Sequence, residues 1–253
     1  MSRIGFIGTG HIAAPMVRFL AERGHEVCVS ECNGDTAQAL RRSHSVDVAT
    51  NQEVLDRSDI VFLCLRPHVA QDVIAALSFR ADHQLVSVMA GLSLATLAEM
   101  CAPACEITMT IPLGYLEQGG CSLPACPDAA ILTALFAPEN PVIPVPDEAA
   151  FNMHFAVCAM APGLLDLMDT GGRWLAEQTG DADNAMRYTS KLVTGFLAAL
   201  PDGDAGQLGQ ERDALATEGT ISLQMTQGLR DGGAHSTLRD TLSAIGDRLG
   251  GAT

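Results

Sequence analysis

The chain has 253 residues, enough for two domains, and 47% of them are apolar while only 4% are aromatic, so we expect an aliphatic core. The formal net charge is −15, with 30 acidic and 15 basic residues, and so acidic a protein repels the phosphates of a nucleic acid. No apolar run reaches the roughly 20 residues of a membrane span. The start, MSRIGFIGTG, enters a folded pattern at once, so no signal peptide is expected. We therefore expect a cytoplasmic protein that binds neither nucleic acid nor membrane.

Eight cysteines are present, but they form no Cys-x-x-Cys pair. Closed zinc sites usually need such tightly spaced ligand pairs, so we expect no metal. The cysteines in apolar stretches are expected to act as small buried hydrophobic residues.

Short apolar runs alternate with amphipathic stretches over residues 1–147. The expected strands are Arg3–Ile7, Glu26–Ser30, Val46–Ala49, Ile60–Leu65, Gln84–Val88, Glu106–Met109 and Val142–Val145. The helices expected between them are Ile12–Arg23, Asp35–Arg42, Val69–Ala76, Ser93–Met100 and Asp128–Ala137, with a short turn near Gln52–Asp56. This alternation predicts an α/β domain with a doubly wound parallel sheet.

Residues 148–253 lack strand-like alternation and predict a smaller, all-helical domain. The expected helices are Phe151–Gln178, bent at Pro162 and Gly163, then Asp183–Leu200, Gln207–Ala216, Ser222–Leu229 and Ser236–Leu249. The first of these is apolar around much of its surface and needs cover on most sides. A second copy of the chain is a natural cover, which predicts a homodimer through the helical domain.

A glycine-rich turn follows the first expected strand and opens the first expected helix. In Gly8-Thr9-Gly10-His11-Ile12-Ala13, the first glycine allows the tight turn and Gly10 lets a pyrophosphate approach the backbone. Ala13 is small enough for close packing of helix and strand. The free amides and positive dipole at the helix start then favour a phosphate. The motif in this context predicts a Rossmann-type dinucleotide site.

Glu31 follows the second expected strand, where an acidic side chain accepts hydrogen bonds from the adenosine ribose. It would repel a 2′-phosphate, and Cys32, Asn33 and Gly34 supply no cation. The cofactor is therefore expected to be NAD(H), with NADP(H) still open. The alternative is that Glu31 is an ordinary solvated carboxylate.

Further candidate cofactor-binding residues fall at the carboxyl ends of later strands, along the edge where open α/β sheets bind ligands. They are Asn51, Leu65, Arg66, Pro67, Ala90 and Gly91. Arg66 could equally be a plain surface cation.

Several blocks resemble the pyrroline-5-carboxylate reductase family. IGFIGTGHIAAPM is similar to that family's start, and also to that of the β-hydroxyacid dehydrogenases. SDIVFLCLRPHVAQDVIAAL, VSVMAGLSLATL and ATEGTISLQMTQGLRDGGAHSTL resemble later family segments in the right order. The resemblance implies proline biosynthesis, with a small-molecule substrate, and hydride transfer from NAD(P)H to a cyclic imine. It also implies an active site where the cofactor meets a dimerising helical domain, with the partner subunit contributing.

The departures from the family pattern fall where substrate should bind. Only Pro112 persists from the family's Met-Pro-Asn-Thr-Pro segment, and Ser-Gly-x-Pro-Ala-Tyr has become apolar around Pro162. The family's Ser-Pro-Gly-Gly-Thr-Thr aligns with residues 217–222, so that Ser222 replaces the threonine that would hydrogen-bond the imine. Glu218 places a negative charge beside the implied carboxylate site. A substrate other than pyrroline-5-carboxylate is therefore open.

Three functions compete. For a reductase, the proton-donor candidates are Ser222 and Thr220, ahead of Tyr188 and His154, although Ser222 could instead cap a helix. A β-hydroxyacid dehydrogenase would need a lysine on the helix Phe151–Gln178, which has none; the chain's one lysine is Lys191. The third possibility is a dinucleotide-binding protein without catalysis, because folds outlive functions.

Overall fold

The computed structural model describes residues 2–200 and 206–251, which divide into two compact units. The first contains the described residues up to 155 together with those from 246 onward, and the second contains residues 156–245. The division falls inside helix α7 (Glu148–Cys158), whose start lies at the boundary expected from sequence. The C-terminal end of the chain thus belongs with the first unit.

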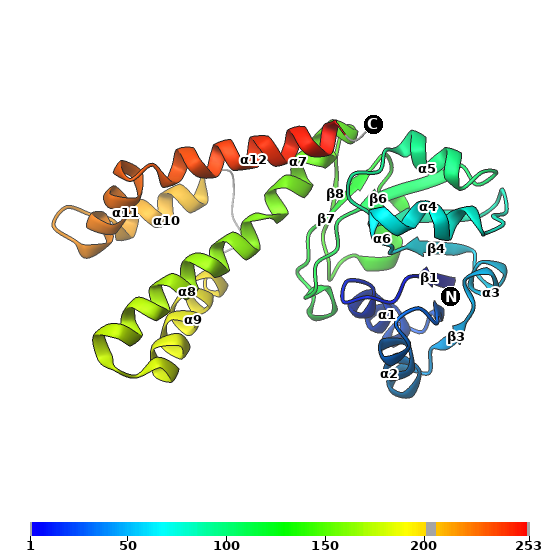
Figure 1. Ribbon diagram of the computed structural model, residues 1–253, viewed down its shortest axis with the longest axis horizontal. Helices are drawn as coiled ribbons and strands as arrows, with labels where there is room; N and C mark the ends of the chain where they lie inside the picture. Colours follow the sequence, from blue (N-terminus) through cyan, green and yellow to red (C-terminus); the bar gives the residue numbers. More distant parts are fainter. Residues whose placement is uncertain (1, 201–205, 252–253) are drawn as a thin grey trace. The chain divides into compact units, whose positions relative to one another are not determined.

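The first unit is built on an eight-stranded sheet in the order β3-β2-β1-β4-β5-β6-β7-β8 (Figure 1). Neighbouring strands are parallel except β6 and β7, which are antiparallel. The strands are β1 (Arg3–Ile7), β2 (Glu26–Ser30), β3 (Asp47–Ala49), β4 (Ile60–Leu63), β5 (Gln84–Ser87), β6 (Glu106–Thr110), β7 (Leu123–Cys126) and β8 (Val142–Pro144). The expected doubly wound sheet is confirmed.

Strand β7 was missed by the sequence analysis. It contains Pro124, which lacks an amide hydrogen and normally argues against a strand inside a sheet. In the structure Pro124 is level with Ile143 of β8, in a strand of only four residues. Two short strands next to each other therefore tolerate a residue that a longer ladder would exclude.

The helices of the first unit connect these strands. They are α1 (Ala13–Glu22), α2 (Gly34–His44), α3 (Asn51–Arg57), α4 (Pro67–Ala75), α5 (Leu94–Met100), the 3₁₀ turn η1 (Leu116–Gln118) and α6 (Ala130–Phe136). The short turn expected near Gln52–Asp56 is a helix of two turns instead. Thr50 caps it by accepting the Glu53 amide, and the Glu53 carboxylate accepts the Thr50 amide in return. This reciprocal pair satisfies two amides that the helix start leaves open.

The centre of the first unit is partly aromatic rather than wholly aliphatic as expected. Phe6 of β1 and Phe62 of β4 stack with ring centroids 4.6 Å apart. Phe136 of α6 meets Phe62 edge-on at 6.1 Å and also contacts Phe19 of α1. Four of the chain's eight phenylalanines thus join the two central strands to helices α1 and α6.

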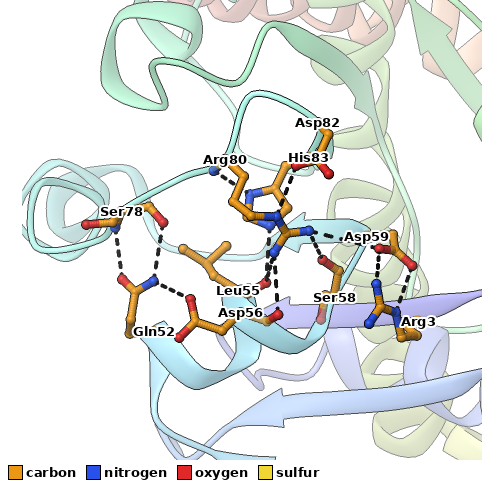
Figure 2. A network of polar contacts seen from close by, with 10 residues as sticks. All are labelled: Arg3, Gln52, Leu55, Asp56, Ser58, Asp59, Ser78, Arg80, Asp82 and His83. Carbon is orange, nitrogen blue, oxygen red and sulfur yellow. Dashed lines mark hydrogen bonds and ion pairs between the residues drawn. The ribbon is translucent and has the colours of Figure 1, made fainter.

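A polar network occupies the amino-terminal edge of the sheet (Figure 2). The Arg3 guanidinium, at the start of β1, pairs with Asp59 just before β4. The ring of His83, just before β5, accepts the Arg80 amide at 3.1 Å and lies 3.1 Å from the Leu55 carbonyl. Burial lowers the pKa of His83, and the Arg80 charge lowers it further. The side chains at this edge are engaged with one another and hold the starts of β1, β4 and β5 together.

The second unit is helical, and helix α7 leads into it. Its helices are α8 (Met160–Thr179), α9 (Ala182–Ala198), α10 (Gln207–Leu215), α11 (Ile221–Asp231) and, up to residue 245, α12 (Ala234–Gly250). The expected bend at Pro162 appears as a break at Ala159, three residues earlier. Proline lacks an amide hydrogen and clashes with the carbonyl four residues before it, here that of Cys158, where α7 ends.

Helices α8 and α9 form an antiparallel pair (Figure 1). Gly172 is buried in this contact, and a Cβ placed on it would lie 2.3 Å from the Met186 sulfur. Many large apolar side chains of the helical unit remain exposed, among them Leu165, Leu167 and Trp174. The stretch Glu148–Thr179 is long and apolar enough to cross a membrane by length and composition alone, a criterion that helices of soluble proteins also meet.

Candidate functional site

The candidate site lies at the carboxyl ends of β1 to β5. The strand order reverses between β1 and β4, because β2 and β3 lie to one side of β1 while β4 and β5 lie to the other. Connections leave such a point in opposite directions and open a crevice at the carboxyl edge. Every cofactor-binding residue predicted from the sequence follows one of these five strands.

Two glycines in the turn after β1 meet different demands. Gly8 has φ +97°, and a Cβ there would lie 2.4 Å from the Cys64 carbonyl oxygen, so only glycine fits. A Cβ on Gly10 would meet nothing within 4 Å, so the space above it is open. Ala13 is fully buried, as close helix packing requires. Gly8 therefore serves the fold, whereas Gly10 leaves room for a ligand.

The start of α1 presents unused hydrogen-bond donors. The Gly10 carbonyl accepts the Ala14 amide, but within the described residues no acceptor is found for the amides of Gly10, His11, Ile12 and Ala13. The helix has ten residues, and its dipole adds positive potential at this end. Amides and open space together fit the pyrophosphate of a dinucleotide without any basic side chain.

The turn is tied to the end of β2 by three hydrogen bonds. The Ser30 hydroxyl accepts the Gly8 amide at 2.9 Å, and the Thr9 hydroxyl donates to the Ser30 carbonyl at 2.6 Å. The Asn33 side-chain amide donates to the Thr9 carbonyl at 3.2 Å. Thr9 is buried, so its hydroxyl faces the protein, and only its backbone remains for the cofactor role expected of it. The sequence analysis missed Ser30 and Asn33.

Glu31 lies directly after β2, and its amide donates to the Ala49 carbonyl of β3 at 3.1 Å. Its side chain is exposed at the carboxyl edge. Asp35 adds a second carboxylate in the first turn of α2, whose arginines lie in its last turn. The end of β2 is therefore locally acidic.

The remaining predicted cofactor residues line the same edge. Asn51 is the first residue of α3, and its side-chain oxygen is buried without a hydrogen-bond partner in the described part of the chain. An orphaned buried acceptor costs about 1–3 kcal/mol, which a ligand donor would recover. Leu65 precedes Arg66, which is the N-cap of α4, with Pro67 as the first helical residue. Arg66 is exposed and forms no ion pair with the residues that the structure describes.

The turn after β5 also suits a close backbone approach. Gly91 has φ +74°, a conformation that favours glycine, and it follows the half-buried Ala90. In the next strand, β6, the Thr110 hydroxyl is buried and has no partner among the described residues. Pro112, kept from the pattern noted in the sequence, is buried just beyond it.

The two hydroxyl candidates for proton donation have different local roles. Thr220 is the N-cap of α11: its hydroxyl accepts the Leu223 amide at 3.1 Å and donates to the Thr217 carbonyl at 2.7 Å. The alternative that Ser222 caps this helix is therefore wrong. The Ser222 hydroxyl forms no side-chain hydrogen bond within the described residues, although its carbonyl accepts from Thr226.

Ser222 lies in a mostly apolar groove of about 440 Å³ on the helical unit. Its apolar members include Leu215, Ile221 and Met225, and its one cation, Arg212, is paired with Asp213 at 2.7 Å. Of the weaker candidates, the His154 ring lies 2.8 Å from the Ala150 carbonyl and Tyr188 is exposed.

No group of metal-ligating side chains occurs among the described residues. Burial raises the pKa of the Cys28, Cys64, Cys101, Cys121 and Cys126 thiols, in Cys101 to about 11. These thiols stay protonated at neutral pH and are poor nucleophiles.

Comparisons with known proteins agree with this geometry. Residues 3–91 match the model of a family described as NADP oxidoreductase coenzyme F420-dependent. Pyrroline-5-carboxylate reductase 3 of Macaca fascicularis is 32% identical over 116 residues, which are 44% of this chain and 42% of that protein. The Danio rerio protein of the same name is 25% identical over 266 residues, 97% of this chain and 90% of that one. The strong identity thus spans less than half the length of several relatives.

Solved structures extend the likeness to the fold of both units. The 1-pyrroline-5-carboxylate reductase of Streptococcus pyogenes superposes with a TM-score of 0.81 at 18% identity and covers 98% of each chain. A reductive aminase from Aspergillus terreus, in complex with NADPH and ethyl-5-oxohexanoate, gives 0.62 at 16% identity over 95% of this chain and 88% of that one. At sequence identities this low, the likeness shows a shared fold and nothing more.

Proposed function

Because the chain is a divergent relative of the pyrroline-5-carboxylate reductase family, we propose that it is an NAD(P)H-dependent reductase of carbon–nitrogen double bonds. The observation that carries the proposal is the turn after β1, where free amides at the start of α1 face open space above Gly10. That arrangement suits an anion such as the pyrophosphate of a dinucleotide.

The residues at the carboxyl edge would hold the cofactor along its length. The amides of Gly10 to Ala13 bind the pyrophosphate, Glu31 takes the adenosine ribose, and the Ala90–Gly91 turn lies on the nicotinamide side. When bound, the reduced nicotinamide supplies two electrons and one proton to the imine carbon. A second proton must reach the imine nitrogen from the chain or from water, giving an amine and oxidised cofactor.

We infer a preference for NADH over NADPH. Glu31 and Asp35 place two carboxylates at the end of β2 and the start of α2, where a 2′-phosphate would sit. Both carboxylates carry the same charge as a phosphate and so oppose its binding. The relatives of known structure include NADP complexes, so this preference would set the present chain apart from them.

Of the two candidate proton donors, Ser222 is the better one. Its hydroxyl is uncommitted among the described residues, whereas the Thr220 hydroxyl already caps α11. A hydroxyl can hydrogen-bond the imine nitrogen and pass a proton to it as the nitrogen becomes basic. Thr220 then has a positioning role, since it holds the helix start that carries Ser222.

The preferred substrate is an imine without a carboxylate. Glu218 lies in the turn before α11, and the groove beside Ser222 is largely apolar, with its arginine neutralised by Asp213. A substrate carboxylate would meet repulsion there and no free cation. Within this class, cyclic imines are the first candidates. Open-chain imines formed from ketones are the second, and the same groove favours both.

A homodimer is the expected assembly. Large apolar side chains stay exposed on α8 and α9, among them Leu165, Leu167, Trp174, Leu192 and Phe196. A patch of this kind marks a protein interface, and two-fold dimers are the commonest arrangement. Size-exclusion chromatography should give about twice the 26.6 kDa chain mass; a monomer would contradict the expectation.

The function is tested by following NADH absorbance with three substrate classes. We expect oxidation of NADH by uncharged cyclic imines, slower oxidation by pyrroline-5-carboxylate, and no NAD⁺ reduction by 3-hydroxy acids. Faster turnover of pyrroline-5-carboxylate would restore a role in proline synthesis and refute the substrate preference. Activity only on 3-hydroxy acids would refute the reductase, and NADH binding without any turnover would indicate a non-catalytic protein.

The role of Ser222 is tested separately with Ser222→Ala. This variant should lose most imine turnover and keep NADH binding, because the hydroxyl acts only on the substrate. Ser190→Ala, which removes an exposed serine hydroxyl from α9, is the matched control and should leave both unchanged. Unchanged turnover in Ser222→Ala would refute the assigned role.

A further inference from the structure

Ser30 occupies an unusual position among the residues of the cofactor edge. It is the last residue of β2 and fully buried, yet its hydroxyl and carbonyl both face the turn after β1. The hydroxyl accepts the Gly8 amide, and the carbonyl accepts the Thr9 hydroxyl. The end of one strand is thus fastened to the phosphate-binding turn of its neighbour through two buried hydrogen bonds.

Asn33 adds a third connection from the same side. Its backbone is left-handed, with φ +66° and ψ +63°, at the N-cap of α2. It makes no side-chain cap for its own helix; instead its amide donates to the Thr9 carbonyl. The Asn33 side chain therefore holds the Thr9 carbonyl of the turn, while the Ser30 hydroxyl holds the Gly8 amide.

We propose that Ser30 and Asn33 are positioning residues that set the affinity for the dinucleotide by orienting the turn at Thr9. The inference rests on the proposed function, because it assumes that the turn binds a pyrophosphate. Ser30 takes up the Gly8 amide and Asn33 the Thr9 carbonyl, so the groups left to face a ligand are the free amides from Gly10 onward. A carbonyl turned toward a phosphate would repel it, whereas these amides attract it.

The arrangement also links the expected binding sites of the adenosine ribose and the pyrophosphate. Glu31, expected at the ribose, lies between Ser30 and Asn33 in sequence, so the ribose and pyrophosphate sites share one rigid connection. Loosening that connection should weaken binding of the whole dinucleotide. It should leave the chemical step alone, because neither residue lies at the strand ends expected near the nicotinamide.

The test uses two variants of the full chain and one control. Ser30→Ala leaves the buried Gly8 amide without an acceptor. Asn33→Gly removes the side-chain donor, and glycine tolerates the left-handed backbone. Ser58→Ala is the matched control, because Ser58 is equally buried in the same unit and its hydroxyl bonds the Val54 carbonyl at 2.6 Å, at the opposite edge of the sheet.

NADH binding is measured by fluorescence titration, beside thermal denaturation of each variant. Ser30→Ala should raise the Kd for NADH about tenfold and Asn33→Gly roughly threefold. Ser58→Ala should lower the melting temperature as Ser30→Ala does and keep the wild-type Kd. In turnover, Ser30→Ala should raise KM for NADH and leave kcat unchanged.

The outcomes distinguish the positioning role of Ser30 and Asn33 from the proposed function. Wild-type binding of NADH together with unaltered Kd in both variants would overturn the positioning role and leave the proposed function intact. Equal weakening by Ser58→Ala would also overturn it, since general loss of stability would then explain the effect. Failure of the wild-type chain to bind NADH would overturn the proposed function and this inference with it.

Discussion

Replacing Gly10 with valine should weaken cofactor binding at least tenfold without harming the fold. A Cβ at Gly10 meets nothing within 4 Å, and the residue does not have the positive φ found at Gly8. A side chain there points into open space in the absence of ligand, so stability should change by less than about 1 kcal/mol. The same side chain occupies the position through which a pyrophosphate reaches the amides of α1.

The size of the binding loss follows from the hydrogen bonds that are displaced. A hydrogen bond to a charged group contributes about 1.5–3 kcal/mol. Losing one of them raises the Kd roughly 10- to 150-fold, and losing two removes measurable binding. Gly10→Val should therefore show at least a tenfold higher Kd for NADH with an unchanged melting temperature.

Gly8→Ala is the contrasting variant. Its Cβ would lie 2.4 Å from the Cys64 carbonyl oxygen at φ +97°, so the backbone itself must move. Left-handed strain of about 1–2 kcal/mol adds to overpacking of about 1–3 kcal/mol, which should lower the melting temperature by several degrees. NADH titration and thermal denaturation of both variants test the argument. Wild-type affinity in Gly10→Val would refute it, because the pyrophosphate would then not lie against this turn.

Three further predictions concern specificity, pH and packing. Glu31→Ser should improve NADPH binding relative to NADH by about tenfold, measured as the ratio of Kd values, because a carboxylate repels the 2′-phosphate; an unchanged ratio would remove Glu31 from the ribose site. Burial holds the folded-state pKa of His83 below its unfolded value, so the free energy of unfolding should be highest above pH about 6.5 and fall as the pH drops below it. His83→Asn should flatten that fall in denaturant titrations; an equally steep fall would assign it to other groups, such as His25, whose pKa burial also lowers. Gly172→Leu should destabilise the α8–α9 pair by about 1–3 kcal/mol, whereas Gly171→Leu should not, since Gly171 has only Thr189 near it at 3.9 Å; equal melting temperatures would refute the packing.

The first unit was predictable because its signals are local. Apolar runs such as IVFLCL identify buried strands, and glycine spacing after β1 identifies the turn. The pattern Thr50-x-x-Glu53 is a capping box and indicates the helical start of α3, where only a short turn was expected. Pro124 hid β7, because a proline argues against a strand unless its neighbours are known.

The tertiary contacts of the site could not be predicted in the same way. From the sequence, Ser30 is only the polar last residue of an apolar strand, and Asn33-Gly34 predicts an ordinary turn. Their partners, Gly8 and Thr9, are more than 20 residues away, so the hydrogen bonds depend on strand register. A single sequence does not specify which side chains at the end of β2 reach the turn after β1.

We propose above that this chain reduces a carbon–nitrogen double bond with a nicotinamide dinucleotide bound at the Gly8–Ala13 turn. The most direct measurement is transfer of deuterium to an uncharged cyclic imine from NADH that carries deuterium at both C4 positions, followed by mass spectrometry of the amine. We expect one deuterium on the former imine carbon for each NADH oxidised, and loss of transfer in Gly10→Val. An unlabelled amine, or full transfer by Gly10→Val, would contradict it.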